Sequence, residues 1–163
     1  MVNWNLIAEK LNESRPGFEG QYRVGIYSRM RMPDGQDDIA RIHIKRMEQA
    51  IKRDSRFCIV KRYQDFGVTT ELEKMLCYRN LLNDCNCGMI DLIIVHDLSR
   101  IGYDYNAVMQ NVSPIAQTTP DVGILFFGER LFCLGSQAYM WTEKMARGDY
   151  SSCQLPYFVG FTQ

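Results

Sequence analysis

The chain has 163 residues, of which 46% are hydrophobic and 23% charged, and its 19 basic residues balance its 19 acidic ones. This composition indicates one globular domain with its own core and excludes a disordered chain. The balanced charge gives no argument for binding nucleic acid or an anionic membrane. No apolar run is long enough to span a bilayer, and the polar residues among the first ten exclude a signal peptide, so we expect a soluble, cytoplasmic protein.

Residues 1–21 are expected to form a leader helix and a linker. Trp4, Ile7 and Leu11 recur at helical spacing, and Asn3 is placed to cap the helix. One proline and two glycines in the segment 15–20 then break the pattern. We expect the helix to pack on the body of the domain; an arm that docks on a partner is the alternative.

Residues 22–147 alternate between strand and helix patterns. Strand patterns lie at 22–29, 57–63, 90–96 and 122–127, and helical spacing at 39–53, 72–85, 105–115 and 137–147. This alternation predicts an α/β fold: an open, mostly parallel sheet of four to five strands with helices on both faces. Residues 148–163 are expected to form a tail that contains a loop or an edge strand.

The six cysteines are expected to be reduced thiols in a cytoplasmic protein. Cys77, Cys85 and Cys87 do not follow the spacing of structural zinc sites, and the two histidines lie far from them in sequence. No glycine-rich phosphate loop follows the first strand. We therefore expect no metal and no cofactor.

The carboxyl ends of the first and third strands each supply an arginine, Arg29 and Arg100. Parallel strands gather their functional groups at this edge, so the two guanidinium groups should converge there. Arginine binds phosphate oxygens bidentately and stays charged at any working pH. The alternative is structural: Arg100 forms a buried ion pair with Asp97 or Asp65.

Three motifs at the strand ends occur in the order and spacing of a known family. They read Tyr-Ser-Arg at 27–29, Tyr-Gln-Asp-Phe-Gly at 63–67 and His-Asp-Leu-Ser-Arg-Ile-Gly at 96–102. Together, over residues 22–130, the chain resembles the catalytic domain of the serine site-specific recombinases, the resolvase and invertase family, and most closely the large serine recombinases of mobile elements. The resemblance implies DNA strand exchange by a dimer, through a serine that links covalently to DNA while arginines stabilise the transition state.

The resemblance assigns a role to each candidate site residue. Arg29 and Arg100 are the phosphate contacts, Ser99 is the small polar residue before Arg100, and Asp97 is the acid ahead of it. The nucleophile stands two residues after the first-motif arginine, and that position holds Arg31. The loss of the serine nucleophile removes the covalent mechanism unless another hydroxyl replaces it.

Two other family positions also differ. Tyr103 replaces the second arginine of the third motif, and the family's Gly-x-Ser-Gly stretch reads Gly-Val-Thr-Thr at 67–70, with its arginine falling near Lys74 or Met75. The sequence carries no helix-turn-helix, zinc ribbon or basic tail, so DNA binding is expected to be weak. We expect a pseudoenzyme: a regulatory or remnant subunit that forms a homodimer or a hetero-oligomer with a full-length recombinase.

Two alternatives stay open. An active recombinase could use a displaced hydroxyl from Ser28, Ser99 or Thr69, although Ser28 should face away from the site because side chains alternate along a strand. Tyr103 is interpreted as the loss of a phosphate contact and not as a new nucleophile. The second alternative is an α/β domain that binds a nucleotide or another small molecule.

Basic residues cluster between 41 and 62, opposed there only by Glu48 and Asp54. We expect the solvated face of the first long helix, with a DNA-facing or partner-facing patch as the alternative. The cluster consists of Arg41, Lys45, Arg46, Lys52, Arg53, Arg56, Lys61 and Arg62.

Overall fold

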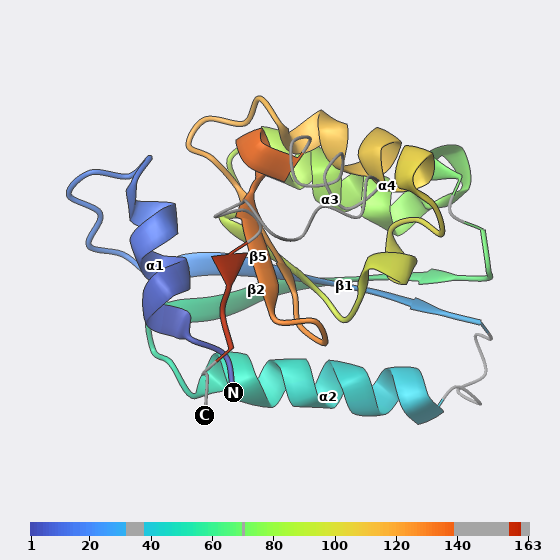
Figure 1. Cartoon of the computed structure of the whole chain (residues 1–163), viewed down its shortest axis with the longest axis horizontal. Helices are drawn as coiled ribbons and strands as arrows, with labels where there is room; N and C mark the ends of the chain where they lie inside the picture. Colours follow the sequence, from blue (N-terminus) through green and yellow to red (C-terminus); the bar gives the residue numbers. More distant parts are fainter. Residues whose placement is uncertain (32–37, 70, 139–156, 161–163) are drawn as a thin grey trace.

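One open sheet of six strands organises the chain in a computed structural model that describes residues 1–31, 38–69, 71–138 and 157–160 (Figure 1). The strand order is β2-β1-β3-β4-β5-β6. The parallel strands are β1 (Tyr22–Met30), β2 (Phe57–Phe66), β3 (Leu92–Val95) and β4 (Gly123–Phe126). β5 (Leu131–Leu134) pairs antiparallel with β4, and β6 (Tyr157–Phe158) pairs antiparallel with β5.

The helices cover both faces of the sheet, so the predicted fold class is confirmed (Figure 1). On one face lie α1 (Trp4–Asn12) and α2 (Asp38–Lys52), and on the other α3 (Leu76–Asn86) and α4 (Tyr105–Val112). Short 3-10 turns are η1 (Leu72–Lys74), η2 (Leu98–Arg100) and η3 (Ser113–Ile115). No helix in the described ranges is long and apolar enough to cross a membrane.

The sheet has more strands than the four to five expected. β5 turns back on β4 through residues 127–130, and β6 adds a short outer strand within the segment expected as a loop or an edge strand. Most of the last expected helix, residues 139–147, lies outside the described residues, as do residues 148–156 and 161–163 of the tail.

Strand alternation divides the core into two layers. On β3, Ile93 and Val95 pack with α3 and α4, while Leu92 and Ile94 pack with α1 and α2; all four are fully buried. The continuous apolar run that predicted this strand is therefore explained by burial on both faces.

The N-terminal helix packs on the sheet and is part of the core. Asn3 caps it as predicted, since its Oδ1 accepts from the Leu6 N–H at 3.2 Å. Ile7 and Leu11 are fully buried. The buried Arg15 guanidinium then donates to the Asp91 carboxylate at 3.0 Å, which fixes the segment after the helix. The division of the chain at residue 21 stays a prediction.

The topology determines where a site can form. The chain runs from β1 outward to β2 and then returns past β1 to β3, so β1 has β2 on one side and β3 on the other. Where the strand order reverses in this way, the helices leave on opposite faces and a crevice opens at the carboxyl ends of the strands. The candidate residues of the first and third motifs lie at this point.

Candidate functional site

A cavity of about 330 Å³, called here the strand-end cavity, opens at the carboxyl ends of β1, β2 and β3. Five of the six candidate site residues from the sequence line it, and Asp97 is not among its lining residues. The lining residues are Arg29, Arg31, Ile39, Gly67, Val68, Ser99, Arg100 and Tyr103.

Arg29 is buried, and its guanidinium group bonds to three protein oxygens. Nη1 donates to the Thr69 carbonyl at 2.5 Å, and Nη2 donates to the Ser99 carbonyl at 2.7 Å. Nη2 also donates to the Tyr103 hydroxyl at 2.9 Å, and the guanidinium carbon lies 5.0 Å from the Tyr103 ring centroid. Arg29 therefore ties the loop after β2 to the loop after β3, and Tyr103 is its direct partner.

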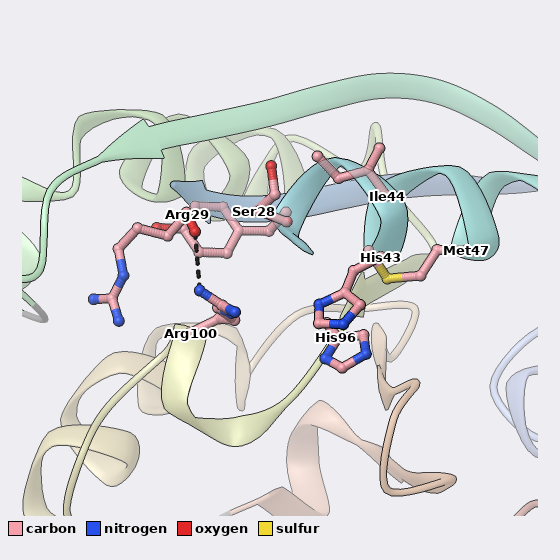
Figure 2. A pocket seen from close by; sticks show the side chains of 9 residues that line it. Ser28, Arg29, His43, Ile44, Met47, His96 and Arg100 are labelled. Carbon is pink, nitrogen blue, oxygen red and sulfur yellow. Dashed lines mark hydrogen bonds between the residues drawn. The ribbon is translucent and has the colours of Figure 1, made fainter. Parts of the chain in front are cut away.

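Arg100 is also bound within the protein. Its Nη1 donates to the Arg29 carbonyl at 3.1 Å, the dashed line in Figure 2, and its Nε lies 3.5 Å from Asp97 Oδ2. The ion pair with Asp97, foreseen as the structural alternative, is thus present, although both side chains are only half-buried.

Asp97 is the centre of a small polar network. Its oxygens accept from the Ser99 hydroxyl and from His96 Nδ1, the latter at 2.9 Å. Burial raises the pKa of Asp97, but the hydrogen bonds from Ser99 and His96 and the charge of Arg100 outweigh this, and the net pKa is lowered. Asp97 is a carboxylate at neutral pH.

Neutral donors hold the Asp65 carboxylate. Its carboxylate accepts from the Tyr27 hydroxyl at 2.9 Å and from the Cys77 and Tyr78 N–H groups at 2.9 and 3.0 Å. These N–H groups belong to the first turn of α3, whose positive end favours a carboxylate. Burial and the Asp65 charge raise the pKa of Tyr27. Asp65 therefore joins β1, β2 and α3 beside the cavity.

Ser28 lies on the other side of β1 from the strand-end cavity, as side-chain alternation predicts. It lines a small pocket under α2 with Ile44, Met47 and the parallel rings of His43 and His96, whose centroids are 3.4 Å apart (Figure 2). Burial, with the charges of His96 and Arg100, lowers the pKa of His43. This stacked pair was not foreseen, because the two histidines are far apart in sequence.

Among the alternative nucleophiles, only Ser99 combines exposure to the cavity with a basic partner. Its hydroxyl donates to the Asp97 carboxylate, whereas the Thr69 hydroxyl accepts from the Glu71 N–H at 3.1 Å. The Asp-x-Ser spacing at 97–99 is the sequence signal for this contact. Lys74 and Met75 supply no cation to the cavity: Lys74 pairs with Glu71, and Met75 is buried.

The cysteines differ in exposure. Cys85 is buried, and burial raises the pKa of its thiol to about 12. Cys77 is half-buried and Cys87 is exposed. Within the described ranges, no three histidine, cysteine or acidic side chains gather closely enough to bind a metal ion.

No protein-family model and no curated protein matches this chain in sequence. Its fold is similar to that of the N-terminal catalytic domain of TP901-1 integrase, with a TM-score of 0.60 and 14% identity over 78% of this chain and 96% of that one. It is also similar to a resolvase family site-specific recombinase from Streptococcus pneumoniae, with a TM-score of 0.59 and 15% identity over 79% of this chain and 88% of that one. The chain therefore has a fold like that of the resolvase catalytic domain.

Proposed function

We propose that this chain is a resolvase-like domain of a mobile-element serine recombinase that does not cut DNA and acts as a regulatory or remnant subunit. The observation that carries the proposal is Arg31, which lines the strand-end cavity two residues after Arg29, where the family's nucleophile stands. A guanidinium group stays protonated at working pH and cannot attack phosphorus as a serine hydroxyl does.

The same cavity keeps features that suit a backbone phosphate. Arg29, Arg31 and Arg100 surround a space of about 330 Å³. Arginine groups of this kind bind phosphate oxygens by charge-assisted hydrogen bonds. Because Arg29 already donates to three protein oxygens, it serves mainly to shape the cavity, and phosphate binding without cleavage is the expected activity.

A covalent-trapping experiment tests the proposal. The full chain is incubated with a pool of duplex oligonucleotides, quenched in denaturant and analysed by denaturing gel and mass spectrometry for protein–DNA adducts. We expect no adduct with the wild-type chain. A phosphoserine-linked oligonucleotide would overturn the proposal. An adduct found with R31S and absent from the wild type would show that the residue at position 31 is what prevents cleavage.

The second candidate function is an active recombinase domain that uses Ser99. The supporting observation is its hydrogen bond to the Asp97 carboxylate at the edge of the cavity. Asp97 would accept the hydroxyl proton as Ser99 attacks, although its lowered pKa makes it a weak base. The S99A, S28A and T69A variants separate the possibilities: this candidate requires an adduct that S99A alone abolishes.

We also propose that the domain assembles with itself or with a full-length recombinase. Sedimentation equilibrium tests the homodimer directly. For the hetero-oligomer, the chain is mixed with a catalytically complete serine recombinase. A decrease in strand exchange that grows with the amount of added chain is expected, and an unchanged rate at excess would exclude the regulatory role for that recombinase.

A further inference from the structure

A second cavity of about 330 Å³, called here the α2 cavity, lies between the N-terminal residues, α2 and the turn that joins β4 to β5. None of its described lining residues belongs to the strand-end cavity, and none of them is acidic. The ones that carry the inference are three arginines and two aromatic residues: Arg46, Arg53, Arg130, Trp4 and Phe127.

Two of the arginines come from α2 and from the turn directly after it. Arg46 lies on α2, Arg53 is the first residue after its end at Lys52, and both line the α2 cavity. Both are exposed, and neither forms an ion pair within the described part of the chain. By contrast, Arg56 and Arg62 of the same basic cluster pair with Asp54 and Glu48. Two of the cluster's arginines that make no such ion pair, Arg46 and Arg53, thus line the α2 cavity.

Arg130 forms the opposite wall. Its backbone has a φ of +58°, a left-handed conformation in which glycine is the unstrained residue. Its guanidinium group lies 4.4 Å from the Phe127 ring centroid and donates to the Phe127 carbonyl. Burial lowers the pKa of Arg130. A strained non-glycine backbone of this kind is typical of functional sites.

Backbone hydrogen bonds join the segments that build this cavity. Val159 accepts from the Asn3 N–H at 2.6 Å and donates its own N–H to the Arg130 carbonyl at 2.9 Å. Val2 and Gly160 form an antiparallel bridge. The N-terminal residues and the β4–β5 turn are therefore fixed relative to each other, as expected of a preformed ligand site.

Trp4 adds a flat apolar wall. One side of its indole packs on Phe57, with ring centroids 4.9 Å apart, and the side chain is only half-buried. Within the described residues its indole N–H has no acceptor. An aromatic ring beside several arginines is the combination that recognises a base joined to a phosphate.

We propose that the α2 cavity binds a nucleoside 5′-phosphate, with the phosphate between Arg46, Arg53 and Arg130 and the base against Trp4. The volume suits a ligand of this size. The same chemistry is presented by a free nucleotide and by a nucleotide within a single DNA strand. The proposal does not depend on the strand-end cavity or on the loss of the nucleophile.

Calorimetric titration of the full chain tests it with four probes: dAMP, deoxyadenosine, inorganic phosphate and a short oligo(dA). We expect saturable dAMP binding, and at least about tenfold weaker binding of deoxyadenosine and of phosphate, because each lacks one half of the contacts. If dAMP and oligo(dA) bind with comparable affinity, a free nucleotide is sufficient as the ligand. If only oligo(dA) binds, the site takes a nucleotide within a DNA strand.

Variants locate the site. R46A, R53A and R130G should each weaken binding about tenfold, since each removes a charged donor. R130G also places glycine where the backbone is left-handed, so backbone strain would not explain a loss of binding in this variant. K45A and K52A remove charges of the same helix outside the cavity and serve as matched controls. The proposal is overturned if no probe saturates, if phosphate binds as tightly as dAMP, or if R31A abolishes binding while R46A and R53A retain it.

Discussion

The two cavities have the same volume, about 330 Å³, and three arginines each, yet their arginines are used differently. In the strand-end cavity, Arg29 donates to three protein oxygens, and Arg100 donates to the Arg29 carbonyl and pairs with Asp97. In the α2 cavity, Arg46 and Arg53 make no ion pair with the described residues.

The difference shows that counting arginines does not measure the charge available to a ligand. A buried guanidinium group with several protein acceptors stabilises the fold, because its removal leaves those acceptors unsatisfied. An exposed one contributes little to stability but meets an incoming anion with its donors available. Stability measurements should therefore respond most to Arg29 in the first cavity, and nucleotide-binding measurements most to Arg46 and Arg53 in the second.

The largest expected effect is that of R29A. Removing this buried guanidinium leaves the Thr69 and Ser99 carbonyls without their donor, and we expect a loss of about 3 kcal/mol in the free energy of unfolding. R46A, the matched change in the other cavity, should cost no more than about 0.5 kcal/mol. Urea denaturation monitored by circular dichroism measures both. Equal costs would contradict the contrast between the cavities.

D65N should have the next largest effect. Its carboxylate accepts from Tyr27 and from two N–H groups of α3, and an amide in its place can accept through only one oxygen. We expect a loss of about 2 kcal/mol, from a weakened helix cap and a buried hydroxyl with a poorer partner. D54N, which disrupts an exposed pair with Arg56, is the control and should change stability by less than about 1 kcal/mol. Thermal unfolding compares them.

Y103F should have a moderate effect. It removes the hydroxyl that accepts from Arg29 and keeps the ring beside the guanidinium group. A loss of about 1 kcal/mol is expected, the contribution of one such hydrogen bond. Wild-type stability in Y103F would mean that Arg29 is fixed by the two backbone carbonyls alone. Chemical denaturation of Y103F beside R29A resolves the two contributions.

The smallest expected effect concerns pH and His43, which lies on α2 and lines the small pocket beside Ser28. Its folded-state pKa is below the unfolded value of 6.5, because burial and the charges of His96 and Arg100 disfavour the imidazolium form; Arg46 acts in the same direction and Asp97 opposes it. The unfolded chain therefore binds the proton more readily, and stability falls as the pH drops through 6.5.

The H43F variant tests the direction of this pH dependence of stability. The phenyl ring can still stack on His96 but binds no proton, so its stability should decrease less than that of the wild type between neutral and mildly acidic pH. The measurement is the thermal midpoint of both proteins across that range. An identical pH dependence would assign the effect to another group.

Much of the fold follows from local pattern. Apolar runs such as 92–95 predict buried strands, helical spacing predicts α1 to α4, and the strand-end rule places Arg29, Arg31 and Arg100 in one cavity. β5 was not predicted, although Leu131–Leu134 is an apolar run, because it follows β4 after only four residues and pairs antiparallel to it, which the expected alternation of strands and helices does not include.

The contacts within the site were less predictable. The bond between Arg29 and Tyr103 and the cap that Asp65 gives to α3 depend on how loops from different strands meet. The α2 cavity combines residues 1–4, 46–53 and 127–130, which no motif links. The basic cluster was visible in the sequence, but which of its charges are neutralised depends on Glu48, Asp54 and Asp84 in three dimensions.

The position of Met1 at the wall of the α2 cavity has a practical consequence for protein production. An affinity tag fused ahead of Met1 would emerge beside Arg46 and Arg53, and a polyhistidine or acidic tag could block the opening or neutralise its charge. Material for the nucleotide titrations should therefore carry no tag ahead of Met1. A tagged sample that fails to bind, beside an untagged sample that does, would itself indicate where the ligand enters.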